Sequence, residues 1–77
     1  MARINESNIT HEDKERHSVH PEVRATYTFF EDNGKKYFQI DTYGKPTRQQ
    51  PEKLSQSLQF DQDTAKYLIK LLIDSMM

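Results

Sequence analysis

The sequence contains no cysteine, only two glycines and no long apolar run among its 77 residues. Without cysteine there is neither a disulfide framework nor a thiolate nucleophile, and such a chain suits a reducing cytoplasm. Turns explain both glycines, so no glycine-rich loop is left to cradle phosphates. No stretch approaches the roughly 18 apolar residues of a membrane span, and the polar N-terminus is unlike a signal peptide. We therefore expect a cytoplasmic protein with no membrane partner.

The sequence also lacks a catalytic or metal-binding constellation. All three histidines lie in the polar first 22 residues, where no cysteine or patterned carboxylate joins them, so we interpret them as solvated side chains. Ser55 and Ser57 have no plausible base, because every histidine is in that N-terminal stretch. Asp61 and Asp63 are better explained as the cap and first-turn charges of a helix. We expect no enzymatic activity, no metal site and no cofactor.

Apolar residues are few and unevenly distributed, which divides the chain into two parts. Hydrophobic residues make up 34% of the sequence, and every phenylalanine and tyrosine follows residue 22. We therefore expect a polar, flexible arm over residues 1–22 and a compact β-β-β-α domain over residues 23–77. A domain of this size has a core near the lower limit for independent folding, and oligomerisation is one common remedy.

The pair Asn33-Gly34 is the clearest local signal, because both residues tolerate the positive φ angles of a type I′ turn. A two-residue turn there fixes the pairing of the flanking strands, with Asp32 facing Lys35 and Glu31 facing Lys36. One face of the hairpin, here called the inner face, then carries Ala25, Tyr27, Phe29, Phe38, Ile40 and Thr42. The opposite, outer face carries Arg24, Thr26, Thr28, Phe30, Tyr37, Gln39, Asp41 and Tyr43.

A third strand and a helix follow. The stretch "LSQSLQF" over residues 54–60 alternates and predicts a strand with a polar outer face, whose inner face carries Leu54, Gln56, Leu58 and Phe60. Asp61 is a natural N-cap for the helix. Residues 2–9 are a candidate fourth strand. These elements predict an α+β fold, in which a single C-terminal helix covers one face of an antiparallel sheet of three to four strands. The apolar stripe of the helix consists of Ala65, Leu68, Ile69, Leu72 and Met76.

Two apolar helix residues, Tyr67 and Leu71, lie four positions apart and off that stripe. They are either singly exposed apolar residues, which are normal, or a second seam that packs on the helix of another copy. Because the core is small, we expect a homodimer with Tyr67 and Leu71 in its interface.

The predicted outer face combines aromatic rings with nearby cations. Rings are stacking platforms for unpaired bases, and cations follow the phosphates of a single strand. The alternative is an ordinary solvent-facing sheet, where rings favour strand structure and pack across it. The net charge of −1 does not favour binding to duplex DNA, and the basic surplus is confined to residues 44–60. The candidate nucleic-acid-binding residues are Arg24, Phe30, Lys35, Lys36, Tyr37, Gln39, Tyr43, Lys45, Arg48, Lys53 and Ser55.

The order "KKYFQIDTYG", then a polar loop ending in Pro51 and Lys53, then "SQSLQFDQDTAKYLIKLL" resembles the transcriptional positive-cofactor family of single-stranded-DNA-binding proteins. The resemblance covers residues 24–73. It implies a four-stranded sheet with one helix, dimerisation through the helices, single-strand binding on the sheet and its loops, and a role in transcription regulation. It also implies nucleic-acid contacts by Tyr37, Gln39, Lys53 and Ser55.

Two functional hypotheses follow. The first is a non-enzymatic module that binds single-stranded DNA or RNA on the sheet face and acts as a helix-paired homodimer. The alternative is a small protein-interaction or regulatory module, an inhibitor or adaptor, that uses the same aromatic face or the N-terminal arm for a protein partner. Only the first predicts that oligonucleotides bind.

Overall fold

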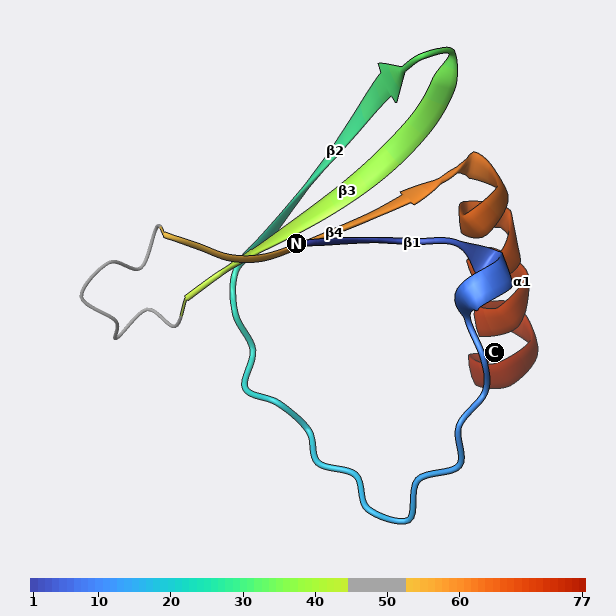
Figure 1. Ribbon diagram of the computed structural model, residues 1–77. Helices are drawn as coiled ribbons and strands as arrows, with labels where there is room; N and C mark the ends of the chain where they lie inside the picture. The colour runs from blue at the N-terminus through green and yellow to red at the C-terminus, as the bar shows by residue number, and fades with distance from the viewer. Residues whose placement is uncertain (45–52) are drawn as a thin grey trace.

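The computed structural model describes residues 1–44 and 53–77 of the chain and confirms the α+β class. A four-stranded sheet has the strand order β1-β4-β3-β2, and one long helix follows its last strand (Figure 1). The pairings β2–β3 and β3–β4 are antiparallel, whereas β1–β4 is parallel. The elements are β1 (Ala2–Ile4), a 3₁₀ turn η1 (Glu6–Asn8), β2 (Ala25–Asp32), β3 (Lys35–Tyr43), β4 (Leu54–Asp61) and α1 (Gln62–Met76).

The hairpin formed by β2 and β3 has the predicted register. Asn33 and Gly34 both have positive φ angles, 54° and 80°. The pairing runs without a shift from Ala25 opposite Thr42 to Asp32 opposite Lys35. The turn chemistry and the alternation of apolar residues therefore specify the same register, and the inner and outer faces of the hairpin are confirmed.

The predicted strand over residues 54–60 is present as β4, but the placement of Leu54 on the inner face is wrong. The β3–β4 pairing is regular from Tyr37 opposite Asp61 to Thr42 opposite Gln56, and then shifts so that Leu54 lies opposite Tyr43. This irregularity adds one residue to β4 and reverses the alternation beyond it. Directly opposite residues share a face, so Leu54 lies on the outer face with Tyr43.

The N-terminal residues join the sheet and the helix. In β1, Ala2 lies opposite Leu58 and Ile4 opposite Phe60, in parallel pairing with β4. Immediately after β1, the backbone N–H of Glu6 donates to the Thr64 hydroxyl at 3.1 Å, and that hydroxyl donates to the Glu6 carboxylate at 2.6 Å. Residues 10–24, which belong largely to the predicted arm, form a long connection without regular structure that loops away from the sheet (Figure 1).

Helix α1 begins at its predicted cap but contacts the sheet only near its start. The Asp61 carboxylate accepts a hydrogen bond from the Thr64 backbone N–H at 2.9 Å, and Thr64 is fully buried. The sequence predicts that the whole apolar stripe packs on the inner face. Instead, Ile69 is 58% exposed and Met76 is 76% exposed, because the helix runs away from the end of β4 (Figure 1). Among residues 1–44 and 53–77, no apolar side chain is buried.

Candidate functional site

The outer face of the sheet is a polar surface to which all four strands contribute. Its central side chains are joined by hydrogen bonds around Asp41, on β3. Gln39 Nε2 donates to Asp41 Oδ1 at 2.8 Å, and the hydroxyl of Ser57 donates to the same oxygen. Gln59 Nε2 extends the chain by donating to Gln39 Oε1 at 2.7 Å. These bonds fix the side chains and place a carboxylate in the middle of the face, where it repels phosphate.

An aromatic pair lies toward the hairpin end of the outer face. The rings of Phe30 and Tyr37 are stacked, with centroids 5.4 Å apart and an interplanar angle of 21°. Arg3 Nη1 donates to the Tyr37 hydroxyl at 3.5 Å, which brings a cation from β1 to the rings. Phe30 is 38% exposed, so part of its ring is accessible.

A second ring and cation lie at the other end of β3. The guanidinium carbon of Arg24 is 4.2 Å from the centroid of the Tyr43 ring, within the range of a cation–π interaction. The hydroxyls of Tyr43 and Thr26 are 3.2 Å apart and share a hydrogen bond. The outer face therefore has a ring-and-cation group at each end of the hydrogen-bonded centre.

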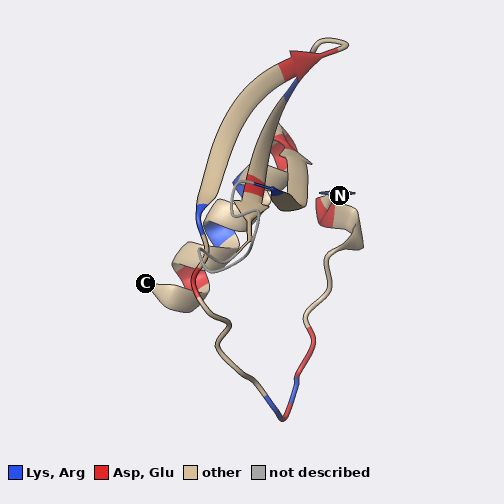
Figure 2. Ribbon diagram, turned by 90° about the vertical axis from the view of Figure 1, so that its left-hand side faces the viewer, with Lys and Arg blue, Asp and Glu red and all other residues tan. Residues whose placement is uncertain are grey.

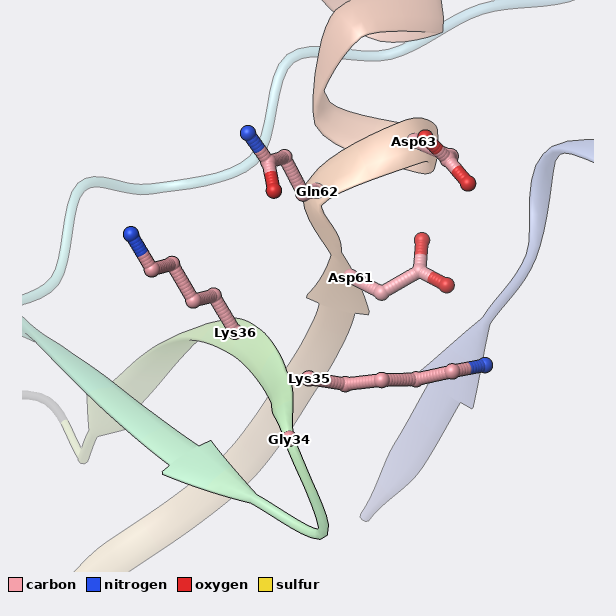
Figure 3. A pocket seen from close by; sticks show the side chains of 6 residues that line it. All are labelled: Gly34, Lys35, Lys36, Asp61, Gln62 and Asp63. Carbon is pink, nitrogen blue, oxygen red and sulfur yellow. The ribbon is translucent and has the colours of Figure 1, made fainter.

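The two predicted lysines of the hairpin do not lie on the same face. Lys35 extends toward the region of Asp61, whereas Lys36 extends in the opposite direction (Figure 3). In the β2–β3 register Lys36 lies opposite Glu31, which places it on the inner side. The pKa of Asp61 is lowered chiefly by the hydrogen bond from the Thr64 backbone N–H, with smaller contributions from the charges of Lys35 and Arg3. Lys35 therefore lies near a carboxylate.

The remaining candidates contribute less to the arrangement. Lys53 and Ser55 are exposed near the start of β4, and Lys45 and Arg48 lie outside the described residues. Sequence reasoning missed Arg3, which reaches Tyr37 only because β1 pairs in parallel with a strand more than fifty residues away. No local pattern in a three-residue strand signals such a pairing.

The inner face carries a continuous cluster of aromatic rings. Phe38 is its centre, with ring centroids 5.9 Å from Tyr27, 5.1 Å from Phe29 and 5.1 Å from Phe60. Tyr27 is 66% exposed and Phe29 is 73% exposed, so the cluster is open along the edge formed by β2. Stacked and tilted rings supply packing within the sheet, but among the described residues Tyr27 and Phe29 stay largely exposed.

The helix adds further exposed apolar residues. The predicted interface residues Tyr67 and Leu71 are both exposed, and so are Ile69 and Leu72 on the stripe. The inner face and the apolar residues of α1 are together called the inner surface. An uncovered apolar area of this extent, over a sheet and a helix, is typical of an interaction site in an isolated chain.

Neither a metal centre nor a membrane-spanning helix occurs in the part of the chain that the structure describes. No group of three His, Cys, Asp or Glu side chains there is placed to hold a metal ion. Within the same residues, no helix combines the length and the apolar character needed to cross a bilayer. His11 and His17 are exposed, and each contacts a neighbour in its own segment, Asp13 and the Lys14 carbonyl respectively.

No protein-family model, curated protein or solved structure matches this chain.

Proposed function

We propose that this chain is a non-enzymatic, homodimeric binding module of the cytoplasm. In this proposal the inner surface joins the two copies, and the outer face holds single-stranded nucleic acid. The observation that carries it is the contrast between the two faces. The inner surface is apolar and uncovered, whereas the outer face is polar, hydrogen-bonded and flanked by rings with cations.

The dimer part rests on stability. Fully burying one large apolar side chain stabilises a protein by about 1.5–3 kcal/mol. The described residues obtain only part of this gain within one chain, because none of their apolar side chains is fully buried. A second copy placed at the β2 side of the inner surface would shield the exposed side chains of Tyr27 and Phe29. Small domains commonly obtain their missing core in this way.

The ligand part rests on the rings at the two ends of the outer face. Stacking of a base on an aromatic ring is sequence-tolerant and contributes about 1–3 kcal/mol per base. Phe30 is 38% exposed, and Arg3 and Arg24 lie beside Tyr37 and Tyr43. Acidic and basic positions are interspersed over the molecule rather than gathered by sign (Figure 2). The central carboxylate of Asp41 confines phosphates to the ends of the face.

This charge distribution predicts that the affinity for single strands depends only weakly on salt concentration. With about two phosphates neutralised, the slope of log K against log salt should be about −1.4 for a single strand. We expect fluorescence anisotropy to show micromolar binding to a labelled single-stranded oligonucleotide, with little binding to the matching duplex. Absence of binding to single strands at 50 µM protein (about the weakest affinity of interest) would refute the ligand assignment.

Variants locate the site. Phe30→Leu keeps an apolar side chain but removes the ring, and should weaken single-strand binding about tenfold. Arg3→Gln should weaken it less and reduce the salt slope. Arg16→Gln is the matched control, because Arg16 lies in the exposed connection between η1 and β2. Equal binding by all three variants would place the ligand elsewhere.

The second candidate is a protein-interaction module that uses the outer face for a polypeptide. The Asp41 network favours it, because a fixed carboxylate with neighbouring amides suits the polar groups of a peptide better than a phosphate backbone. It predicts a stable dimer that does not bind oligonucleotides. The anisotropy experiment therefore separates the two candidates without requiring the partner to be known.

A further inference from the structure

Strand β2 forms one edge of the sheet and is built in a way that edge strands usually avoid. It spans eight residues, Ala25–Asp32, with the sequence ATYTFFED. It contains no proline, no lysine and no bulge, and its acidic residues come only at the end near the turn. The opposite edge, β1, has three residues. Long, regular and apolar edge strands are templates for pairing with another strand.

The register shows which backbone groups of β2 face away from the sheet. In a hairpin closed by a two-residue turn, the residues that flank the turn form a hydrogen-bonded pair, and such pairs alternate along the ladder. Asp32, Phe30, Thr28 and Thr26 therefore bond to β3, as does Arg24, whose carbonyl accepts from the Tyr43 N–H at 3.0 Å. The outward-facing N–H and C=O groups belong to the alternate residues Ala25, Tyr27, Phe29 and Glu31.

The outward-facing backbone groups and the most exposed rings belong to the same residues. Tyr27 and Phe29 carry outward-facing backbone groups, and their side chains lie on the open side of the inner aromatic cluster. A strand that paired with β2 would satisfy these groups and place its own side chains beside both rings. One additional strand, paired with β2, could therefore satisfy the edge and also contact the exposed rings.

We propose that β2 pairs antiparallel with β2 of a second copy about a two-fold axis at Thr28. This inference rests on the proposed homodimer and specifies that its copies meet along the β2 edge of the inner surface, where Tyr27 and Phe29 lie. The axis is normal to the sheet, so the two sheets join into one of eight strands, with both outer faces on one side and both helices on the other. Eight strands lie within the usual range for an open twisted sheet.

Charge and register favour this axis over its neighbours. Pairing about Thr28 places Arg24 opposite the partner's Asp32 at both ends, because β2 has a basic residue before its start and acidic residues at its end (Figure 2). It also sets Tyr27 opposite the partner's Phe29, an aromatic cross-strand pair. An axis at Tyr27 or at Phe29 would align fewer outward-facing residues and would leave Arg24 without an acidic residue opposite it.

The pairing has a consequence for ligand binding. Phe30 would lie opposite the partner's Thr26 on the outer face, because the two positions are equidistant from the axis. The Phe30–Tyr37 stack of one copy would then lie next to the part of the outer face that carries Tyr43 in the other. Two short ring-and-cation surfaces thus become one continuous surface, and the dimer should hold a longer single strand than one chain could.

A charge exchange at Thr28 tests the axis. Thr28 is exposed on the outer face, and only an axis at this residue brings it opposite itself. Thr28→Lys and Thr28→Glu should each raise the dimer dissociation constant about fivefold or more, because like charges then lie directly opposite. An equimolar mixture should restore the wild-type constant by forming the mixed dimer. Thr10→Lys, the same change in the long connection, is the control and should leave the dimer unchanged.

Amide hydrogen exchange distinguishes the two levels of the proposal. If the wild type sediments as a dimer and the amides of Tyr27 and Phe29 exchange slowly, the edge pairing is supported. A dimer in which these two amides exchange freely, or in which Thr28→Lys and Thr28→Glu associate as the wild type does, refutes the pairing and leaves the dimer intact. A wild type that remains monomeric at 100 µM (well above a micromolar dissociation constant) refutes both.

Discussion

Replacing Thr64 with valine should detach the N-terminal residues from the body of the molecule. The Thr64 hydroxyl donates to the Glu6 carboxylate at 2.6 Å and accepts from the Glu6 backbone N–H at 3.1 Å. A hydrogen bond to a charged group contributes about 1.5–3 kcal/mol and a neutral one about 0.5–1.5 kcal/mol. Glu6 is half-buried and regains water when released, so the lower ends apply and the expected loss is about 2 kcal/mol.

The loss is local, because the helix cap does not depend on the hydroxyl. Asp61 accepts from the backbone N–H of Thr64, which valine retains. The weakened part is therefore β1 with η1, and amide exchange in β1 should accelerate about 25-fold. Urea denaturation and amide exchange measure the two effects, and Thr64→Ser, which keeps the hydroxyl, is the matched control. If Thr64→Val unfolds and exchanges as the wild type does, the hydroxyl does not anchor the N-terminus.

Three further changes test other parts of the structure. The pKa of Asp61 is lowered in the folded chain, so the ionised carboxylate stabilises the fold above the ordinary pKa of 3.8, and this stabilisation is lost as pH falls through the folded pKa. Asp61→Asn keeps an acceptor for the helix cap but cannot titrate. It should therefore remove this contribution from denaturation curves recorded between pH 7 and pH 2 (the range in which a carboxyl group titrates). Gly34→Ala should cost about 1 kcal/mol in urea unfolding, because φ is +80° although no atom lies within 4 Å of the added Cβ, and an unchanged midpoint would argue against the type I′ turn. If the helices meet in the dimer through Tyr67 and Leu71, Leu71→Glu should shift the sedimentation profile toward monomer. If Ile69→Glu has that effect and Leu71→Glu does not, the apolar stripe of α1 forms the contact instead.

The local features of this fold were predictable, whereas the long-range ones were not. Asn33-Gly34 and the alternation around it specify the β2–β3 register, and Asp61 specifies the start of α1, because each signal acts within a few residues. Two features depend on pairing between segments that are distant in the sequence: the parallel addition of β1, and the bulge that moves Leu54 to the outer face. The residues next to each feature do not indicate such pairing.

The candidate site shows the same division. The pairs Phe30–Tyr37 and Arg24–Tyr43 follow directly from the hairpin register, and both are in contact. Arg3 joins the site through β1 and was not recognised. Helical spacing predicted an apolar stripe on α1, but spacing cannot tell whether the covering surface belongs to the same chain. The exposure of Ile69 shows that the described part of the chain does not cover this part of the stripe, which helical spacing could not indicate.

The mass of the wild-type chain in solution tests the central claim most directly. Sedimentation equilibrium at concentrations from 1 to 100 µM (a range that brackets a micromolar dissociation constant) should give a mass approaching twice the 9.2 kDa of one chain. The account predicts that the β2 edge is then protected from solvent, which slow exchange of the Tyr27 and Phe29 amides reports. A mass that stays at 9.2 kDa across this range, with a cooperatively folded chain, would contradict it.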